Sequence, residues 1–410
     1  MCEPPLQVVD LSRFASARRL TPVTARLNEE SPIRKGSVHV IVGVPKEIKN
    51  NEFRVGMTPA GVAEFVAHGH GVLVESSAGE GSSFADAEYV EAGATMVATA
   101  DEVFAQADMI VKVKEPQAVE IAKLRPGQIL YTYLHLAPDY EQTMGLVGSK
   151  AVCIAYETVE LPNRSLPLLA PMSEVAGRMA AQVGATYLQK PFGGRGTLMG
   201  GVPGTHPAKV VVLGGGVVGT NAAYVAMGMG ADVTIMDISL DRLRYLDEIW
   251  GNRIRTVYSS KHNVQQEVYA ADLVIGAVLL PGAKTPFLVT KDMLPKMKKG
   301  AVLVDVSVDQ GGCIETTHAT THADPTYFVD GVLHYGVANM PGAVPNTSTM
   351  ALTNATLRYG LAIADKGWKQ AVKDDAALAK GINVIDGKVT YKEVADVHGL
   401  EYVPLESLIA

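Results

Sequence analysis

The chain of 410 residues has little of several things that mark specialised classes of protein. It has three cysteines, Cys2, Cys153 and Cys313, and their wide separation excludes a disulfide framework and shows no metal-ligand spacing. It has no excess of positive charge, since the formal net charge of −7 leaves no basic footprint for nucleic acid. We therefore expect no metal, no nucleic-acid partner and a reducing compartment, the cytoplasm.

Long apolar runs are also scarce. The one candidate for a membrane span is the stretch 210–231, which has 22 residues without a charge and is long enough to cross a bilayer. Six of these residues are glycine, Thr220 and Asn221 lie near the middle, and the run begins with three β-branched valines. This composition favours a strand and a turn over a membrane helix, so we expect no membrane partner.

Residues 1–39 differ from the rest of the chain. They hold six basic and four acidic side chains, a net charge of +2, and no apolar core of the kind that a secretory signal needs. The four acids also argue against a transit peptide. We expect an appended, poorly ordered tail or a start-site artefact.

Glycine is what the chain has in excess, at 40 of 410 residues against a usual share of about 7%. Beyond the tail, strand patterns alternate with helical ones, which predicts parallel β-α-β units. The expected strands are 38–44, 72–75, 109–114, 129–135 and 151–157, and the expected helices run from Thr58-Pro59 to about Gly69 and over 141–148. Thr58 is a good N-cap, and Pro59 suits the first helical position.

The alternation stops at a long helix predicted over 173–188 and a glycine-rich loop over 190–207, and it resumes from Lys209 to about Pro341. Helices are expected over 349–366 and 368–380, followed by a turn at Asp386-Gly387. We predict an α/β protein in which a second domain is inserted into the first. The predicted parts are a tail (1–39), a discontinuous domain (40–167 and 346–410) and an inserted domain (168–345).

The strongest local motif lies at the start of the inserted domain. A strand enters Gly214-x-Gly216-x-x-Gly219, a helical pattern follows, and a second strand ends at Asp237, 18 residues after the last glycine. This is the context that a dinucleotide-binding motif requires. Glycines let backbone N–H groups approach a pyrophosphate, while Asp237 would accept hydrogen bonds from ribose hydroxyls and repel a 2′-phosphate, which favours NAD over NADP. A purely structural glycine turn is the alternative.

The glycines of loop 193–204 carry no comparable prediction. No strand directly precedes the loop and it has no Gly-Lys-Ser/Thr, so it is not a phosphate-binding P-loop, and a connecting role is expected.

Polar residues follow several predicted strands. In open parallel sheets ligands bind outside the carboxyl ends of the strands. Five polar residues stand at or after such ends: Arg54, Lys114, His135, Asn339 and Asp309, the last at the end of a strand predicted over 302–309. We predict that these five side chains converge on one site. On this argument alone Lys112 is as good a candidate as Lys114.

Several blocks of sequence occur together in order and carry a family resemblance. They are 43–54, 111–116, 131–136, 171–177, the glycine motif, 305–312 and 337–342. Through them the chain resembles the L-alanine dehydrogenases over 41–410. The resemblance implies two Rossmann-like domains with parallel sheets around a cleft, an NAD-binding domain inserted into a discontinuous substrate domain, and a homohexamer. It also implies reversible oxidative deamination of L-alanine to pyruvate and ammonia with NAD as cofactor.

The resemblance also assigns roles to residues. Arg54 and Lys114, rather than Lys112, resemble the substrate-binding pair, and the fork of Arg54 would bind the substrate carboxylate bidentately. His135 and Asp309 resemble the acid/base residues, with the division of work between them open. The NAD contacts join the three motif glycines, and they are Ser173, Val217, Val218, Asp237, Arg242, Ser259, Val278, Leu279, Val306, Ser307, Val308, Asp309, Val337, Ala338, Asn339 and Met340.

Two other functions stay open at this point. One is a transhydrogenase-like nucleotide-binding module that passes hydride to a partner protein. The other is action on a bulkier amino acid, as in enzymes of the lysine/saccharopine type.

Overall fold

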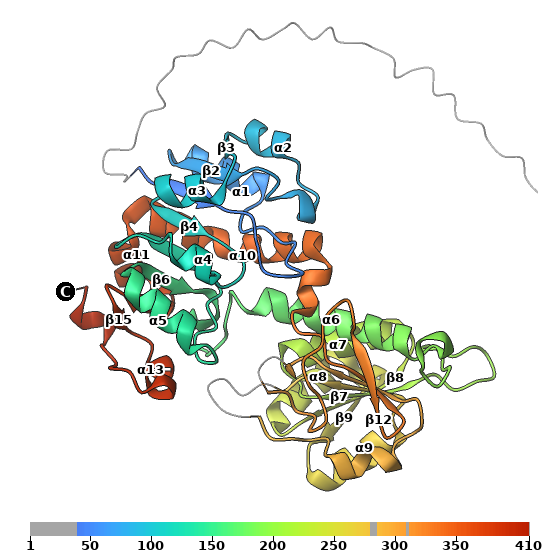
Figure 1. Cartoon of the computed structure of the whole chain (residues 1–410). Coiled ribbons are helices and arrows are strands. Elements are labelled where there is room, and N and C mark those ends of the chain that lie inside the picture. Colours follow the sequence, from blue (N-terminus) through green and yellow to red (C-terminus); the bar gives the residue numbers. More distant parts are fainter. Residues whose placement is uncertain (1–38, 279–284, 309–310, 410) are drawn as a thin grey trace, which may run out of the picture. The chain divides into compact units, whose positions relative to one another are not determined.

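The computed structural model describes residues 39–278, 285–308 and 311–409 (Figure 1). All but the last residue of the tail predicted over 1–39 lie outside this described part. Two sheets organise residues 39–409, one of eight strands in the order β15-β14-β6-β5-β4-β1-β2-β3 and one of seven in the order β12-β13-β11-β10-β7-β8-β9. Among the helices of the described residues, none is both long and apolar enough to cross a membrane.

The eight-stranded sheet is formed from both ends of the described chain. Its strands are β1 (Ile41–Val44), β2 (Gly71–Glu75), β3 (Thr95–Val97), β4 (Met109–Val111), β5 (Ile129–Thr132), β6 (Val152–Ala155), β14 (Ile382–Ile385) and β15 (Lys388–Val389). The connecting helices are α1 (Pro59–Ala67), α2 (Asp86–Glu91), α3 (Ala100–Gln106), α4 (Ala118–Ile121) and α5 (Tyr140–Ser149). Strands β1 to β6 pair in parallel. The predicted cap of α1 is confirmed, since the Thr58 hydroxyl accepts from the Gly61 N–H.

The seven-stranded sheet comes from one continuous stretch. Its strands are β7 (Lys209–Leu213), β8 (Asp232–Asp237), β9 (Arg255–Tyr258), β10 (Leu273–Gly276), β11 (Val302–Asp305), β12 (Thr326–Val329) and β13 (Val332–Tyr335). The helices within it are α7 (Val217–Gly228), α8 (Leu240–Trp250) and α9 (Lys261–Ala270). The predicted α/β class with two mostly parallel sheets is confirmed, although the sheets are mixed: β12 pairs antiparallel to β13, and β14 pairs antiparallel to β6 and β15.

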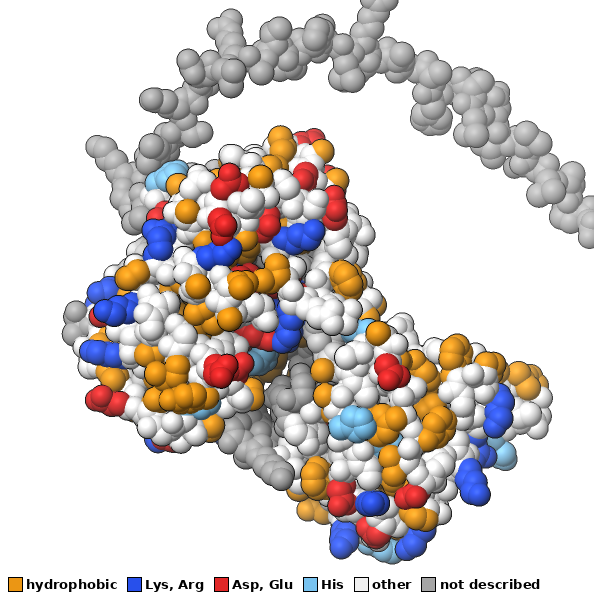
Figure 2. Space-filling model, viewed as in Figure 1, with side chains coloured by type: hydrophobic (Ala, Val, Ile, Leu, Met, Phe, Trp, Pro, Cys, Tyr) orange, Lys and Arg blue, Asp and Glu red, His pale blue; other side chains and the backbone are white. Residues whose placement is uncertain are grey.

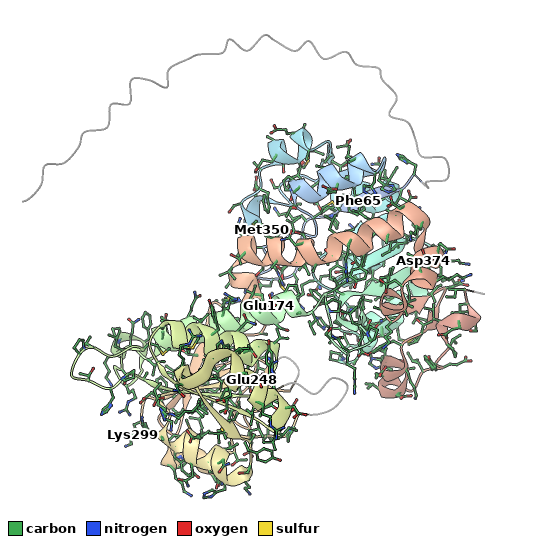
Figure 3. All side chains as sticks on the ribbon, turned by 180° about the vertical axis from the view of Figure 1, so that it is seen from behind. Phe65, Glu174, Glu248, Lys299, Met350 and Asp374 are labelled. Atoms are coloured by element: carbon green, nitrogen blue, oxygen red, sulfur yellow. The ribbon has the colours of Figure 1, made fainter. Side chains whose placement is uncertain are left out.

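Two long helices join the parts of this fold. Helix α6 (Ala170–Tyr187) packs against α7, α10 and β11, and helix α10 (Pro345–Lys366) packs against α1. A Cβ at Gly177 of α6 would lie 2.2 Å from the Val218 carbonyl oxygen, so this glycine permits the close approach of α6 to α7. Figure 3 shows Met350 on α10 and Phe65 on α1, and a Cβ at Gly360 would lie 3.2 Å from Phe65 Cζ.

Some predicted bounds were wrong, each for a local reason. The strand expected to end at Asp309 ends at Asp305, because the Asp305 carboxylate accepts hydrogen bonds from the N–H groups of Ser307, Cys313 and Ile314 and so starts a turn. The helix predicted over 368–380 is two helices, α11 (Trp368–Asp374) and α12 (Ala376–Ala379), because Asp375 caps the second.

Two predicted helices begin earlier than expected, and one predicted turn is confirmed. Helices α6 and α10 each begin a few residues before the predicted start, at segments that carry Pro171 and Pro345 in the first turn. Proline is tolerated there because the first helical N–H groups lack helical partners. The turn predicted at Asp386-Gly387 is confirmed, with positive φ at both residues between β14 and β15. A last helix, α13 (Lys392–His398), follows.

The central strands of both sheets are buried on both faces, which explains their continuous apolar sequences. Strands β4, β5, β6, β10, β11 and β13 are buried at every position. On the surface, basic and acidic side chains are interspersed over the face shown in Figure 2.

Candidate active site

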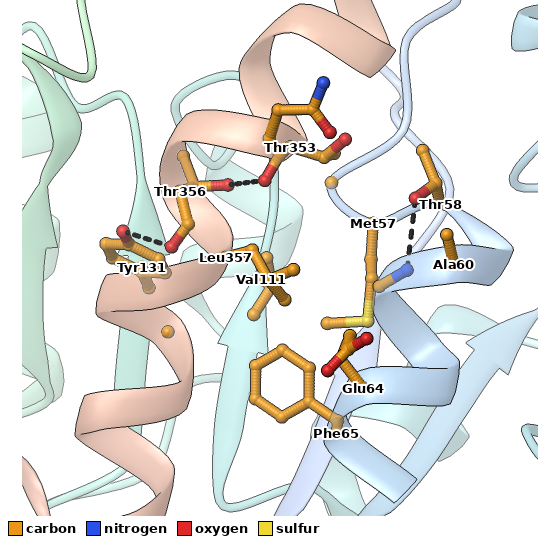
Figure 4. A pocket seen from close by; sticks show the side chains of 14 residues that line it. Met57, Thr58, Ala60, Glu64, Phe65, Val111, Tyr131, Thr353, Thr356 and Leu357 are labelled. Atoms are coloured by element: carbon orange, nitrogen blue, oxygen red, sulfur yellow. Dashed lines mark hydrogen bonds between the residues drawn. The ribbon is translucent and has the colours of Figure 1, made fainter. Parts of the chain in front are cut away.

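Two cavities compete for the role of a small-molecule site. One, of about 160 Å³, lies between α1 and α10, with Phe65, Leu357 and Tyr131 among its walls (Figure 4). The Tyr131 hydroxyl there donates to the Thr356 carbonyl at 3.1 Å. None of the predicted site residues lines this cavity. The other, of about 120 Å³, is lined by Arg54, Lys114, Tyr133, His135, Leu169, Met172, Ser173, Ala176, Val218, Val306, Ser307, Asn339, Met340 and Pro341.

Four of the five polar residues that were expected to converge therefore line one cavity: Arg54, Lys114, His135 and Asn339. The fifth, Asp309, lies outside the described residues. Arg54 belongs to the loop after β1, Lys114 and His135 follow β4 and β5, and Asn339 follows β13 of the other sheet. The strand-end rule thus selected residues that the fold brings together.

Arg54 is almost fully buried and its guanidinium is held by three partners. Nε donates to Glu52 Oε1 at 2.7 Å, and Nη2 donates to Glu52 Oε2 at 2.5 Å and to Asn339 Oδ1 at 2.8 Å. Nη1 lies 3.0 Å from the Met172 sulfur. The Nε–Nη2 edge is therefore occupied by Glu52, so the bidentate grip expected of Arg54 cannot use this edge while that pair is formed.

Glu52 is ionised in this environment. Burial alone would raise the pKa of its carboxyl, but the hydrogen bonds and charge of Arg54 outweigh burial and lower the pKa to about 2. Asn339 Nδ2 adds a hydrogen bond to Glu52 Oε2 at 3.0 Å. Glu52 and Asn339 therefore fix the plane of the guanidinium from two sides, and Nη1 is the edge least occupied by protein.

Lys114 follows β4 in a segment whose backbone is held by Glu47. Glu47 Oε1 accepts from the N–H of Val113 at 2.6 Å and from that of Lys114 at 3.3 Å. The Lys114 ammonium lies 3.9 Å from Glu115 Oε2. Burial would raise the pKa of the Glu115 carboxyl, but the charge of Lys114 and a hydrogen bond from Lys49 lower it overall. Lys114 thus stands beside an ionised carboxylate.

His135 follows β5 with a φ of 48°, a left-handed conformation that is uncommon for a residue other than glycine. Its backbone N–H donates to Glu157 Oε1 at 2.6 Å, and the preceding carbonyl, of Leu134, accepts from the Gln142 amide at 2.6 Å. The imidazole is stacked on Tyr133, with ring centroids 5.6 Å apart and planes at 10°. These contacts hold the turn that presents the imidazole to the cavity.

The glycine motif forms the turn between β7 and α7. Gly214 has a φ of 101°, which favours glycine, and a Cβ at Gly219 would lie 1.8 Å from the Gly214 carbonyl oxygen. By contrast, a Cβ at Gly216, which caps α7, would meet no atom within 4 Å, and no side chain caps the helix there. Gly216 therefore leaves open space beside unpaired helical N–H groups, a cradle that fits the pyrophosphate of a dinucleotide.

The charged residues near this turn also bind it. Asp237, at the end of β8, accepts from the Gly215 N–H at 2.7 Å and from the Ser239 N–H at 2.8 Å. Arg242 of α8 donates from Nε to the Gly215 carbonyl at 2.6 Å and from Nη2 to the Thr220 hydroxyl at 2.7 Å. A carboxylate therefore stands at the carboxyl end of the second strand, where a ribose would lie.

The remaining predicted contacts divide into three groups. Five of them line the cavity with Arg54 and Lys114: Ser173, Val218, Val306, Ser307 and Met340. Six others do not line it. Val217 begins α7, Ser259 follows β9, Val278 adjoins Gly214, Val308 follows β11, and Val337 and Ala338 follow β13. Leu279, like Asp309, lies outside the described residues.

Sequence reasoning missed the glutamates that bind the backbone at Arg54, Lys114 and His135: Glu52, Glu47 and Glu157. A signal existed for Glu157, because it ends the segment 151–157 that was predicted as a strand, and the same strand-end rule had selected Lys114 and His135. Glu47 and Glu52 stand in the same sequence block as Arg54. Their pairing with particular backbone N–H groups, across 66 positions for Glu47 and Val113, has no local signature.

Comparison with known families matches the chain to two models. The N-terminal domain model of alanine dehydrogenase/PNT matches residues 43–176, and the C-terminal domain model matches residues 180–392. The transhydrogenase of Sinorhizobium meliloti is a more distant structural match, with 27% identity and a TM-score of 0.73, and it covers 86% of this chain and 99% of that one.

Relatives named alanine dehydrogenase are much more similar. Those of Halomonas elongata and Methanococcus maripaludis are each 57% identical, over 90% of this chain and 99% and 100% of theirs. A solved structure titled L-alanine dehydrogenase is 52% identical, with a TM-score of 0.85 over 88% of this chain and 99% of that one. The resemblance inferred from the sequence blocks is thereby confirmed, and the chain belongs to the alanine dehydrogenase/PNT family.

Proposed function

We propose that this protein catalyses the reversible oxidative deamination of L-alanine to pyruvate and ammonia with NAD as cofactor. The observation that carries the proposal is that the relatives at 54–57% identity are alanine dehydrogenases. The cavity supports it, because Arg54 and Lys114 line it together with Val218 of the glycine motif. The charges of Arg54 and Lys114 suit a small carboxylate. A module that only passes hydride to a partner protein would have no use for Arg54, Lys114 and His135 in one cavity.

The residues at the turn after β7 suit NAD. Gly214, Gly216 and Gly219 would let the N-terminus of α7 bind the pyrophosphate, and Asp237 would bind the ribose hydroxyls. When bound, the nicotinamide supplies the acceptor for the hydride that leaves the substrate Cα. The negative charge of Asp237 disfavours the 2′-phosphate of NADP, and this supports NAD as the cofactor.

Arg54 and Lys114 would bind the substrate carboxylate and the carbonyl oxygen. Because Glu52 and Asn339 occupy Nε and Nη2, Arg54 offers its Nη1 edge to the carboxylate, beside Met172. Lys114 then places a second positive charge in the cavity, where it can stabilise negative charge that develops on the carbonyl oxygen.

His135 would move the protons. Loss of hydride from Cα leaves an iminium that water attacks, and this addition and the departure of ammonia need a group that takes and returns protons. Imidazole is the side chain whose ordinary titration range suits that task, and His135 presents it to the cavity. We keep Asp309 as the second acid/base residue on the strength of the family resemblance alone.

We also propose the domain division expected from the sequence: residues 40–167 with 346–410 for the substrate and 168–345 for NAD. The membership of the two sheets supports it, because β1–β6 join β14 and β15 while β7–β13 form the other sheet. A cytoplasmic homohexamer is proposed from the resemblance, and light scattering of the purified protein tests the number of subunits.

The proposed reaction is tested by the near-ultraviolet absorbance of NADH. Purified protein with L-alanine and NAD in alkaline buffer should form NADH, and pyruvate with ammonium and NADH should consume it near neutral pH. NADP and larger amino acids, lysine included, should give much lower rates. If the folded protein binds NADH but shows no alanine-dependent formation of it, the proposed reaction is wrong.

A further inference from the structure

A buried ion cluster stands two residues before Lys114, on the same strand end. The side chain of Lys112 is 0% exposed, and its ammonium lies 2.7 Å from Glu120 Oε1 and 3.1 Å from Glu47 Oε2. Lys112 does not line the cavity that Lys114 enters. A buried charge is retained only where partners compensate it, so this cluster calls for an explanation beyond substrate binding.

The two glutamates use their second oxygens differently. Glu120 Oε2 accepts from the Gln117 N–H at 2.8 Å and so caps the short helix α4. Glu47 Oε1 accepts from the N–H groups of Val113 and Lys114. Both carboxylates thus neutralise Lys112, but only Glu47 also contacts the backbone that carries Lys114.

Glu47 connects the two loops that carry Arg54 and Lys114, the proposed substrate-binding residues. It lies three residues after β1, in the chain segment that continues to Arg54, and it reaches across to the segment after β4. Two further bonds hold the backbone at that point, from the Tyr156 hydroxyl to the Lys112 carbonyl at 3.0 Å and from the Thr132 hydroxyl to the Lys114 carbonyl at 2.9 Å. The backbone on either side of Val113 is therefore bound by both donors and acceptors.

We propose that Glu47 is a positioning residue for the substrate site: its carboxylate, anchored on buried Lys112, sets the backbone of Val113 and Lys114 and so places the Lys114 ammonium in the cavity. This inference rests on the proposed function for the role of Lys114. In the same geometry Glu120 neutralises Lys112 and caps α4, so its two oxygens bind the Lys112 ammonium and the Gln117 N–H.

The matched pair Glu47→Met and Glu120→Met tests this assignment. Each variant removes one carboxylate from the same lysine, so a purely structural role predicts equal effects. We expect Glu47→Met to raise the KM for pyruvate tenfold or more, with kcat changed less than threefold and the Kd for NADH within twofold of the wild type. Glu120→Met should leave the KM within twofold, and Glu47→Gln, which keeps an acceptor oxygen, should recover most of the loss. Equal KM values in the two methionine variants would overturn the proposal.

A second variant covers the case in which Glu47→Met does not fold. Glu47→Asp keeps the charge beside Lys112 but withdraws the carboxylate by one methylene from the two N–H groups. We expect it to raise the KM for pyruvate at least threefold at a nearly unchanged melting temperature, and an unchanged KM would contradict the proposal.

A readout that needs no turnover separates this inference from the proposed function. Lys114 can be acetylated with acetic anhydride and its modification followed by peptide mass spectrometry. Glu47→Asp should change the rate at Lys114 at least threefold, and Glu120→Met should not. Absence of alanine turnover in the wild type would refute the proposed reaction, whereas unchanged labelling of Lys114 would refute the positioning role.

Discussion

The two sheets present the proposed ligand-binding groups by different means. After β1, β4 and β5 the groups are long polar side chains, and each sits in a segment whose backbone N–H is bound by a glutamate: Arg54 by Glu52, Lys114 by Glu47 and His135 by Glu157. After β7 the proposed group is a turn of glycines, where the open space at Gly216 would let the backbone itself bind.

The difference follows from what each ligand needs. A small carboxylate is recognised by few charges, so each charge must be fixed in direction, and a buried carboxylate that binds both side chain and backbone does this at Arg54. A pyrophosphate is recognised by several N–H groups at once, so close approach matters more than charge. Substitutions should therefore act on one ligand and spare the other.

The largest expected effect is at the glycine turn. Gly219→Ala places a Cβ 1.8 Å from the Gly214 carbonyl oxygen, so the turn must move. Displacements of about 1 Å can cost about a hundredfold in a positioned site, and we expect the Kd for NADH, measured by fluorescence titration, to rise at least that much. The control is Gly228→Ala at the other end of α7, where a Cβ meets no atom within 4 Å. If both variants bind NADH like the wild type, close packing of this turn is not what shapes the site.

The converse effect is expected at Arg54. Arg54→Lys keeps the charge but removes the planar fork that Glu52 and Asn339 hold. Without that fork no donor is held at the Nη1 position, and loss of one charge-assisted hydrogen bond to the carboxylate costs about 1.5–3 kcal/mol. The KM for pyruvate should therefore rise about ten- to a hundredfold while the Kd for NADH stays within twofold. The control in steady-state assays is Arg125→Lys, because the Arg125 guanidinium donates to the backbone carbonyls of Phe104 and Ala107 and does not line the cavity. If Arg54→Lys weakened NADH binding as much as it raised the KM for pyruvate, the two regions would not differ in the way proposed.

The same contrast explains what could be predicted from the sequence. The glycine turn is local: spacing, a preceding strand and the acid at Asp237 lie within about 30 positions, and periodicity reveals them. Arg54, Lys114 and His135 were found because strand ends meet at one edge of a sheet. The glutamates were missed because the pairs of Glu47 with Val113 and of Glu52 with Asn339 span 66 and 287 positions, and only the folded chain brings them together.

A smaller effect is expected at Glu52, and it depends on pH. The pKa of Glu52 is lowered to about 2 from an ordinary 4.5 because the hydrogen bonds and charge of Arg54 outweigh its burial. Its ion pair therefore contributes stability fully above pH 4.5, and this contribution is lost as the pH falls toward 2. The unfolding free energy of Glu52→Gln, measured in urea, should lie below that of the wild type near neutral pH and approach it in acid. Glu174→Gln, at an exposed position of α6, should show no such convergence. A difference that is constant with pH would mean that Glu52 is not held as an ion.

The smallest expected effect is on the choice of cofactor. Asp237→Asn keeps an acceptor for the Gly215 N–H, which the carboxylate now binds at 2.7 Å, but removes the negative charge that faces a 2′-phosphate. Because Arg242 already donates to the same turn, its positive charge would then be unopposed there. We expect the ratio of kcat/KM for NADP to that for NAD to rise about tenfold, or about 1.4 kcal/mol, with the KM for pyruvate unchanged. Asp232→Asn, at the other end of β8 and paired with Arg255, is the matched control. If the ratio does not change, the charge of Asp237 does not contribute to the choice between NAD and NADP, and the shape of the turn accounts for it.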